Sequence, residues 1–208
     1  MNYNRIISFG CSHVEGDGLD SQLEVYSNVL ANKMNMSHVN CGQSGASNKS
    51  ILYNILNFDY RVTDIVVILW THAERTTFFH QPGWFTLLNP NWDPQDKKIK
   101  FIKKYYKTYY NEYHHDVEST HSIHHGDLFL KQKNIKAYHL LQRPFENYNN
   151  NYFKDIKICN VFFSEIRHNY PKANDNFHMG KEGHAALADC VYKIIKRNNL
   201  ISLKDCCN

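Results

Sequence analysis

The sequence has no apolar run long enough to cross a membrane, and no leader-like segment precedes its first predicted strand. Its six cysteines show neither Cys-x-x-Cys spacing nor a disulfide framework, which indicates reduced thiols. Together these absences predict a cytoplasmic protein with no membrane partner. The formal net charge of +4 is too mild to indicate nucleic-acid binding.

Apolar strand-like runs alternate with segments of helical periodicity along the 208 residues. Such alternation predicts parallel strand pairing. We therefore expect a single α/β domain over residues 1–208, a three-layer α/β/α sandwich with a central parallel sheet of about five strands. The strands are expected at Arg5–Gly10, Ser37–Asn40, Asp64–Trp70 and Ala137–Leu141, and the helices at Ser21–Met34, Ser47–Phe58 and Gly180–Arg197.

Two segments interrupt this alternation. Thr76–Asp96 is rich in aromatic residues, Pro and Gly, and an irregular stretch of this length is typical of a binding loop or lid. Lys97–Lys131 lacks Pro and predicts either one long helix or two.

Histidines gather in the second of these segments. His114, Glu118, His121 and His125 follow one another at helical spacings, so one helix face presents either metal ligands or a solvated histidine-rich surface. No His-Glu-x-x-His motif is present, and Gly126 can end the helix nearby. The solvated face is therefore the favoured interpretation.

A candidate nucleophile directly follows the first predicted strand. That strand ends in Phe9-Gly10-Cys11-Ser12, which places Ser12 at the carboxyl edge of the sheet, where open α/β sheets carry reactive groups. Near the other end of the chain, Asp175 precedes His178 by three residues, so its carboxylate can orient the imidazole within one loop. Ser12, His178 and Asp175 are thus candidates for the nucleophile, base and orienting acid of a hydrolase. The alternative is a turn serine and a surface Asp-x-x-His.

These segments resemble the sequence blocks of the SGNH hydrolases, also called the GDSL esterase/lipase family. Phe9-Gly10-Cys11-Ser12 resembles the family's first block, Phe-Gly-Asp-Ser, and Asp175 to His178 resembles its last, Asp-x-x-His. The glycine loop Gly42–Gly45 resembles the second block. The third block, Gly-x-Asn-Asp, is replaced by Trp70-Thr71-His72-Ala73-Glu74-Arg75. The resemblance implies a flavodoxin-like SGNH fold and a serine esterase that needs no metal or organic cofactor.

The resemblance also implies the donors of an oxyanion hole. These are the backbone N–H groups of Ser12 and Gly45, with a side chain from the third block as a further donor. His72 occupies the position of the family's Asn, and a neutral imidazole can donate one hydrogen bond. Alternatively, the third donor is Asn48 or is missing.

Four further residues are candidate substrate contacts: His13, Asn48, Arg75 and Trp84. His13 either faces the pocket or lies on the surface of the turn. Arg75 either binds a substrate carboxylate or phosphate or holds its own loop, and Trp84 either stacks on a sugar or packs within the insert.

The expected partner is a small-molecule or carbohydrate ester, with an O-acetylated carbohydrate favoured by the aromatic insert. Two other functions stay open. The departure at His72 allows a catalytically weak or inactive SGNH-fold protein with a binding or structural role. The cluster from His114 to His125 allows a metal-dependent phosphoesterase.

Overall fold

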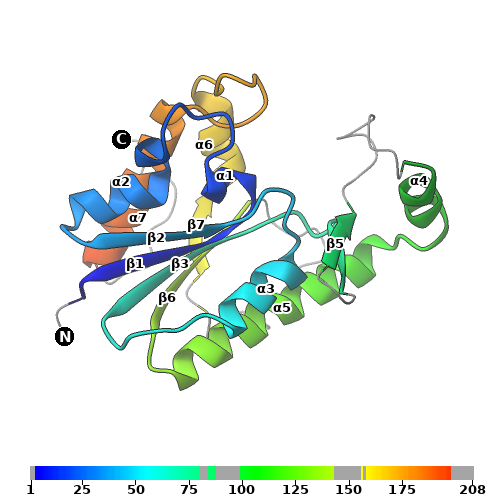
Figure 1. Cartoon of the computed structure of the whole chain (residues 1–208), viewed down its shortest axis with the longest axis horizontal. Helices are drawn as coiled ribbons and strands as arrows, with labels where there is room; N and C mark the ends of the chain where they lie inside the picture. Colours follow the sequence, from blue (N-terminus) through cyan, green and yellow to red (C-terminus); the bar gives the residue numbers. More distant parts are fainter. Residues whose placement is uncertain (1–2, 80–83, 88–98, 143–155, 157, 198–208) are drawn as a thin grey trace.

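The computed structural model of the chain describes residues 3–79, 84–87, 99–142, 156 and 158–197 (Figure 1). A five-stranded sheet lies at its centre, with the strand order β2-β1-β3-β6-β7 and parallel pairing throughout. This confirms the predicted parallel α/β architecture. The strands are β1 (Arg5–Gly10), β2 (Ser37–Gly42), β3 (Asp64–Trp70), β6 (Lys136–Leu141) and β7 (Ile158–Phe162).

Helices cover both faces of this sheet (Figure 1). On one face α2 (Tyr26–Lys33) packs against α7 (Lys181–Arg197), and on the other α3 (Asn48–Leu56) packs against α5 (Glu112–Gln132). The remaining helices are α1 (Ser12–Glu15), a 3₁₀ turn η1 (Gln22–Glu24), α4 (Ile99–Thr108) and α6 (Phe163–Asn169). None of the helices in the described ranges combines the length and the apolar character that a membrane span requires.

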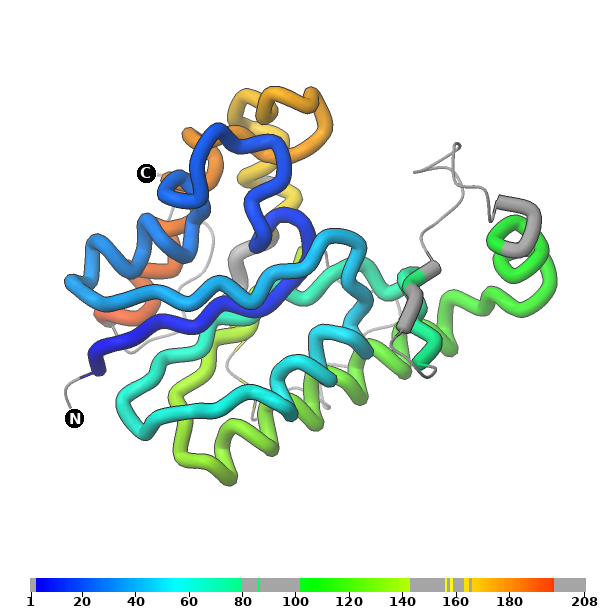
Figure 2. The backbone as a smooth tube through the Cα atoms, in the orientation of Figure 1, coloured from blue at the N-terminus to red at the C-terminus, as the bar shows by residue number. Residues whose placement is uncertain are grey.

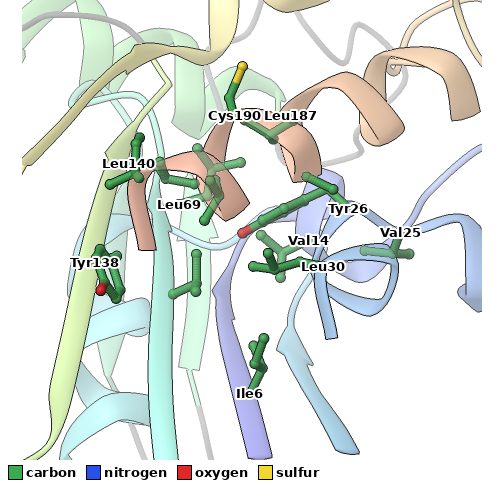
Figure 3. Close-up of a cluster of buried hydrophobic side chains, with 14 of the residues drawn as sticks. Ile6, Val14, Val25, Tyr26, Leu30, Leu69, Tyr138, Leu140, Leu187 and Cys190 are labelled. Carbon is green, nitrogen blue, oxygen red and sulfur yellow. The ribbon is translucent and has the colours of Figure 1, made fainter. Parts of the chain in front are cut away.

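The continuous apolar run of β3 is explained by burial on both faces. Its alternate residues Ile65, Val67 and Leu69 belong to the core beneath α2 and α7, part of which Figure 3 shows. The residues between them, Val66, Ile68 and Trp70, belong to the core beneath α3 and α5. Successive side chains of a strand point to opposite faces, so the residues from Ile65 to Trp70 are buried between two helical layers and all are apolar.

The first atypical segment differs from the irregular loop that the sequence predicted, whereas the second follows one of its two alternatives. Residues Thr76–Phe79 and Trp84–Leu87 form an antiparallel hairpin, β4 and β5, while residues 88–96 lie outside the described part. Lys97–Lys131 contains two helices, α4 and α5, and Gly126 does not interrupt α5. The side chain of Asn111 caps α5 by accepting a hydrogen bond from the His114 N–H at 3.0 Å, which explains where the second helix begins.

The strand order creates a crevice at the carboxyl edge of the sheet. The chain leaves β1 toward β2 on one side, whereas it leaves β3 toward β6 on the other, and ligands of open α/β sheets bind where the order reverses in this way. The loop after β1 and the loop before α7 lie side by side at this edge (Figure 2), where the Asn174 N–H donates to the Gly18 carbonyl at 3.1 Å.

Candidate active site

Ser12 begins α1 at the carboxyl edge of the sheet and is 6 % exposed. Gly10 makes this tight turn possible, because a Cβ at that position would overlap with the side chain of Val14. Ser12 opens onto a cavity of about 210 Å³ at the sheet edge. The cavity is also lined by His13, His72, Arg75, Gln142, Arg167 and Phe177.

Asp175 and His178 form a hydrogen-bonded pair within one loop, as their spacing predicts. Asp175 Oδ2 contacts His178 Nδ1, and Asp175 Oδ1 accepts the backbone N–H groups of Phe177 and His178, each at 2.9 Å. Burial raises the pKa of the Asp175 carboxyl, but these hydrogen bonds outweigh that effect and hold the pKa below its ordinary value. The carboxylate therefore engages Nδ1, which leaves Nε2 of His178 for proton exchange.

The ring of His13 connects Ser12 with this pair. His13 follows Ser12 directly in α1, and its ring centroid lies 4.9 Å from that of His178 in an edge-to-face arrangement. Within the described residues no hydrogen bond joins the Ser12 hydroxyl to His178. Such contacts are often long before a substrate is bound.

His13 itself is buried, contrary to the alternative that placed it on the surface. It is 2 % exposed and also packs on Phe163, with ring centroids 4.4 Å apart. Burial lowers the pKa of His13 well below its ordinary value, and the positive charges of His178 and Arg167 lower it further. His13 is therefore a neutral ring beside the candidate base.

The glycine loop supplies one of the two candidate oxyanion donors, the Gly45 N–H, and packs against α1, which supplies the other, the Ser12 N–H. Gly45 has a φ of 74°, a left-handed conformation that favours glycine. Gly42 packs directly on the backbone of α1, where a Cβ would overlap with Glu15 N. Among the backbone contacts between described residues, neither the Ser12 N–H nor the Gly45 N–H is donated to a protein acceptor. Both groups thus remain able to bind an oxyanion.

The loop after β3 contributes His72 and Arg75 to the cavity wall. His72 Nδ1 lies 3.9 Å from the Glu74 carboxylate. Arg75 donates a hydrogen bond through Nη1 to the Ala46 carbonyl at 3.2 Å, which ties this loop to the glycine loop. The structure therefore gives Arg75 a loop contact as well as a place in the cavity wall.

Asn48 holds loops together, which differs from the sequence-based expectation that it contacts substrate. It is 2 % exposed, its Nδ2 donates to the Thr71 carbonyl at 3.1 Å and to Ser119 Oγ at 3.0 Å, and its Oδ1 accepts the Thr71 N–H at 2.8 Å. Both amide hydrogens are thus used within the protein. Trp84 lies in β5, and its side chain falls outside the described part.

The histidines of α5 do not assemble a metal site with their neighbours. His114 and His115 approach Glu118 at 3.6 Å and 3.9 Å, and the rings of His121 and His125 lie 6.3 Å apart. No group of three or more His, Cys, Asp or Glu in the described ranges is arranged to hold a metal ion. The phosphoesterase alternative therefore has no support from this helix.

Three cavity residues were not among the sequence-based candidates: Gln142, Arg167 and Phe177. Gln142 follows β6 directly, so its place at the carboxyl edge could have been predicted from the strand. Arg167 belongs to α6, a short helix that the sequence analysis did not assign.

No protein-family model and no curated protein match the sequence, but solved structures share its fold. A psychrotrophic esterase from Pseudoalteromonas sp. superposes with a TM-score of 0.59 at 15 % identity over 94 % of this chain and 100 % of that one. An acetylxylan esterase from Geobacillus stearothermophilus gives 0.55 at 16 % identity over 94 % and 95 %. A member of the lipolytic protein G-D-S-L family from Veillonella parvula gives 0.51 at 14 % identity over 93 % and 98 %. The chain therefore has the fold that the resemblance to SGNH hydrolases implied.

Proposed function

We propose that this chain, which has the SGNH-hydrolase fold, is a serine esterase that cleaves carboxylic esters through an acyl-serine intermediate. One observation supports the proposal: Ser12 and the Asp175–His178 pair come from opposite ends of the chain, and His13, which lines the cavity beside Ser12, contacts the ring of His178. A turn serine and an unrelated surface Asp-x-x-His would have no reason to converge there.

The proposed reaction begins with attack of Ser12 Oγ on the ester carbonyl carbon while His178 Nε2 takes the hydroxyl proton. The tetrahedral intermediate collapses, and the leaving alcohol receives that proton from His178. His178 then deprotonates a water molecule, which attacks the acyl-serine. The second tetrahedral intermediate collapses, His178 returns the proton to Ser12 Oγ, and the carboxylic acid is released. Asp175 holds the His178 ring through Nδ1 and stabilises the imidazolium in both steps.

The negative charge on the carbonyl oxygen is assigned to the Ser12 and Gly45 N–H groups, with His72 as the third donor. A neutral His72 has one N–H to donate, so it can take the part that an amide side chain plays in the family. The neutral ring of His13 suits this chemistry, because a second charged histidine beside His178 would oppose formation of the imidazolium.

The proposed substrate class is an acyl ester of a small molecule or carbohydrate, with an O-acetylated carbohydrate favoured. The likeness in fold to an acetylxylan esterase supports this choice. The hairpin β4–β5 adds support, because it begins directly after Arg75 and carries the exposed aromatic side chains Phe78 and Phe79.

Labelling with a fluorophosphonate probe tests the proposal. We expect the wild-type protein to be labelled, and Ser12→Ala and His178→Ala to lose at least about 99 % of the labelling rate, since an unactivated serine is a poor nucleophile. The matched controls are Ser37→Ala and His121→Ala, both at exposed positions outside the site, and they should label like the wild type. A folded wild-type protein that does not react, or labelling that survives in Ser12→Ala, would contradict the proposal and favour a binding role.

A further inference from the structure

The cavity at Ser12 has a strongly one-sided charge. Two arginines, Arg75 and Arg167, line it, and no carboxylate occurs among the described residues that form its wall. Two carboxylates lie close to the wall: Asp175 is engaged by His178 and by its own loop backbone, and Glu74 lies 3.9 Å from His72 Nδ1. A substrate entering this cavity therefore meets two guanidinium groups, which recognise carboxylates, sulfates and phosphates through charge-assisted hydrogen bonds.

Each guanidinium is held in place by a different catalytic loop. Arg75 is tied to the carbonyl of Ala46, the residue after Gly45, on the oxyanion side of the cavity. Arg167 donates through Nη2 to the Phe177 carbonyl at 2.7 Å, and its guanidinium carbon lies 5.2 Å from the centroid of the Phe177 ring. Phe177 precedes His178, so Arg167 is fixed on the side of the base. Such anchoring reduces the entropy lost when a ligand is bound.

The positive charge of Arg167 is only partly balanced by negative charge nearby. Burial lowers the pKa of its guanidinium, and the Asp175 carboxylate only partly offsets this effect. The positive charges of Arg167 and Arg75 both help to lower the pKa of His13, so both charges act on the same buried imidazole beside Ser12. An anionic ligand beside Arg167 would relieve the cost of removing its charge from water.

Gln142 supplies a polar group at the same wall. Its Oε1 accepts a hydrogen bond from Thr71 Oγ1 at 3.1 Å, which makes its NH₂ the end available to a ligand. The cavity thus presents donors from three directions in addition to the candidate oxyanion hole.

We propose that the substrate of this enzyme is an ester that also carries an anionic group, a carboxylate, sulfate or phosphate, and that Arg75 and Arg167 bind that group. The inference rests on the proposed esterase function for the reaction, but the anion site can be tested without turnover.

The kinetic test compares acetate esters of four phenols. Three carry a para carboxylate, sulfonate or phosphate, and the fourth carries a neutral methyl ester. For the preferred anion, we expect the ratio of its kcat/KM to that of the neutral ester to fall about 10- to 100-fold in Arg167→Gln and Arg75→Gln. Arg167→Lys, which keeps the charge without the planar fork, should fall between. The control Arg61→Gln, at an exposed position before β3, should leave the ratio within about twofold of wild type.

The ratio separates recognition from structural damage, because a loop disturbance lowers turnover of charged and neutral esters alike. Unchanged ratios in both arginine variants would therefore overturn the anion site while leaving the esterase function intact. If the wild type hydrolyses none of the four esters, the esterase function fails, and binding decides the inference. Calorimetry with Ser12→Ala and benzoate, benzenesulfonate or phenyl phosphate should then show binding that Arg167→Gln weakens about tenfold or more. Absence of binding to all three probes would overturn the inference.

Discussion

The two edges of the central sheet place a paired carboxylate in opposite surroundings. At the amino edge, Asp64 opens β3, is fully buried, and accepts two hydrogen bonds from the Arg5 guanidinium at 2.8 Å and 2.7 Å. The Arg61 N–H adds a third at 2.7 Å. At the carboxyl edge, Asp175 lies in a loop, its side chain is 35 % exposed, and its side-chain partner is His178.

The difference lies in what each partner can do. The hydrogen bond with Asp64 raises the pKa of Arg5 above an already high value, so the guanidinium stays charged and the role of the contact is to hold β1 against β3. An imidazole can take up and release a proton during a reaction, so the pair of His178 with Asp175 is suited to chemistry. We therefore expect substitutions at the two edges to separate stability from activity.

The largest effect is expected at the carboxyl edge. Asp175→Asn should lower kcat by roughly 10⁴-fold, because an amide can donate to His178 Nδ1 and so favour the wrong tautomer for a base. The free energy of unfolding should change by less than about 1 kcal/mol, since the site is partly exposed and Asn still accepts the loop N–H groups. Ester hydrolysis and urea denaturation measure the two quantities.

The control for this substitution is Asp189→Asn, an exposed acid that pairs with Lys33 far from the cavity, and it should change neither quantity. A kcat within tenfold of wild type for Asp175→Asn would show that Asp175 does not orient the base.

At the amino edge we expect the reverse. Asp64→Asn should lower the free energy of unfolding by about 3–5 kcal/mol, because it leaves the Arg5 guanidinium without its countercharge in a largely buried position. The kcat per folded molecule should stay near wild type. The neighbouring exposed acid offers a matched control in Asp59→Asn, and equal stability of the two variants would refute the structural role of the pair.

The sequence predicts best where one local signal decides the structure. The bounds of β1 and β3 agree with their apolar runs, because a strand covered on both faces consists mostly of apolar residues. The strand β7 and the helix α6 were not predicted. Both are short, and the neighbours that bury Phe163 and Ile166 come from distant parts of the chain.

The candidate site shows the same division. Ser12, Asp175 and His178 could be proposed because each stands in a short motif, and their catalytic roles stay predictions; the structure pairs Asp175 with His178 and brings His178 against His13. Arg167 was not predicted, because its place in the cavity depends on α6. The expectation for Asn48 failed for a related reason: the sequence cannot show that its amide is directed to Thr71 and away from the cavity.

The smallest expected effect is the pH dependence of stability that the buried His184 produces, and it changes gradually with pH. His184 in α7 is fully buried and accepts the Tyr26 N–H at Nδ1 at 3.1 Å. Burial lowers the pKa of His184 to about 4, and the positive charge of His178 adds to this.

Between about pH 6.5 and 4 the unfolded chain binds a proton at His184 and the native protein does not, so stability falls as the pH falls, by about 3 kcal/mol at most. We expect denaturation curves of His184→Gln between pH 7 and pH 4 to show a free energy of unfolding that depends less steeply on pH. The slope should fall by an amount that corresponds to the uptake of up to one proton on unfolding. His168→Gln, at an exposed position on α6, should keep the wild-type slope. If His184→Gln also kept it, the acid sensitivity would belong to other buried histidines, with His13 the first to examine because burial lowers its pKa as well.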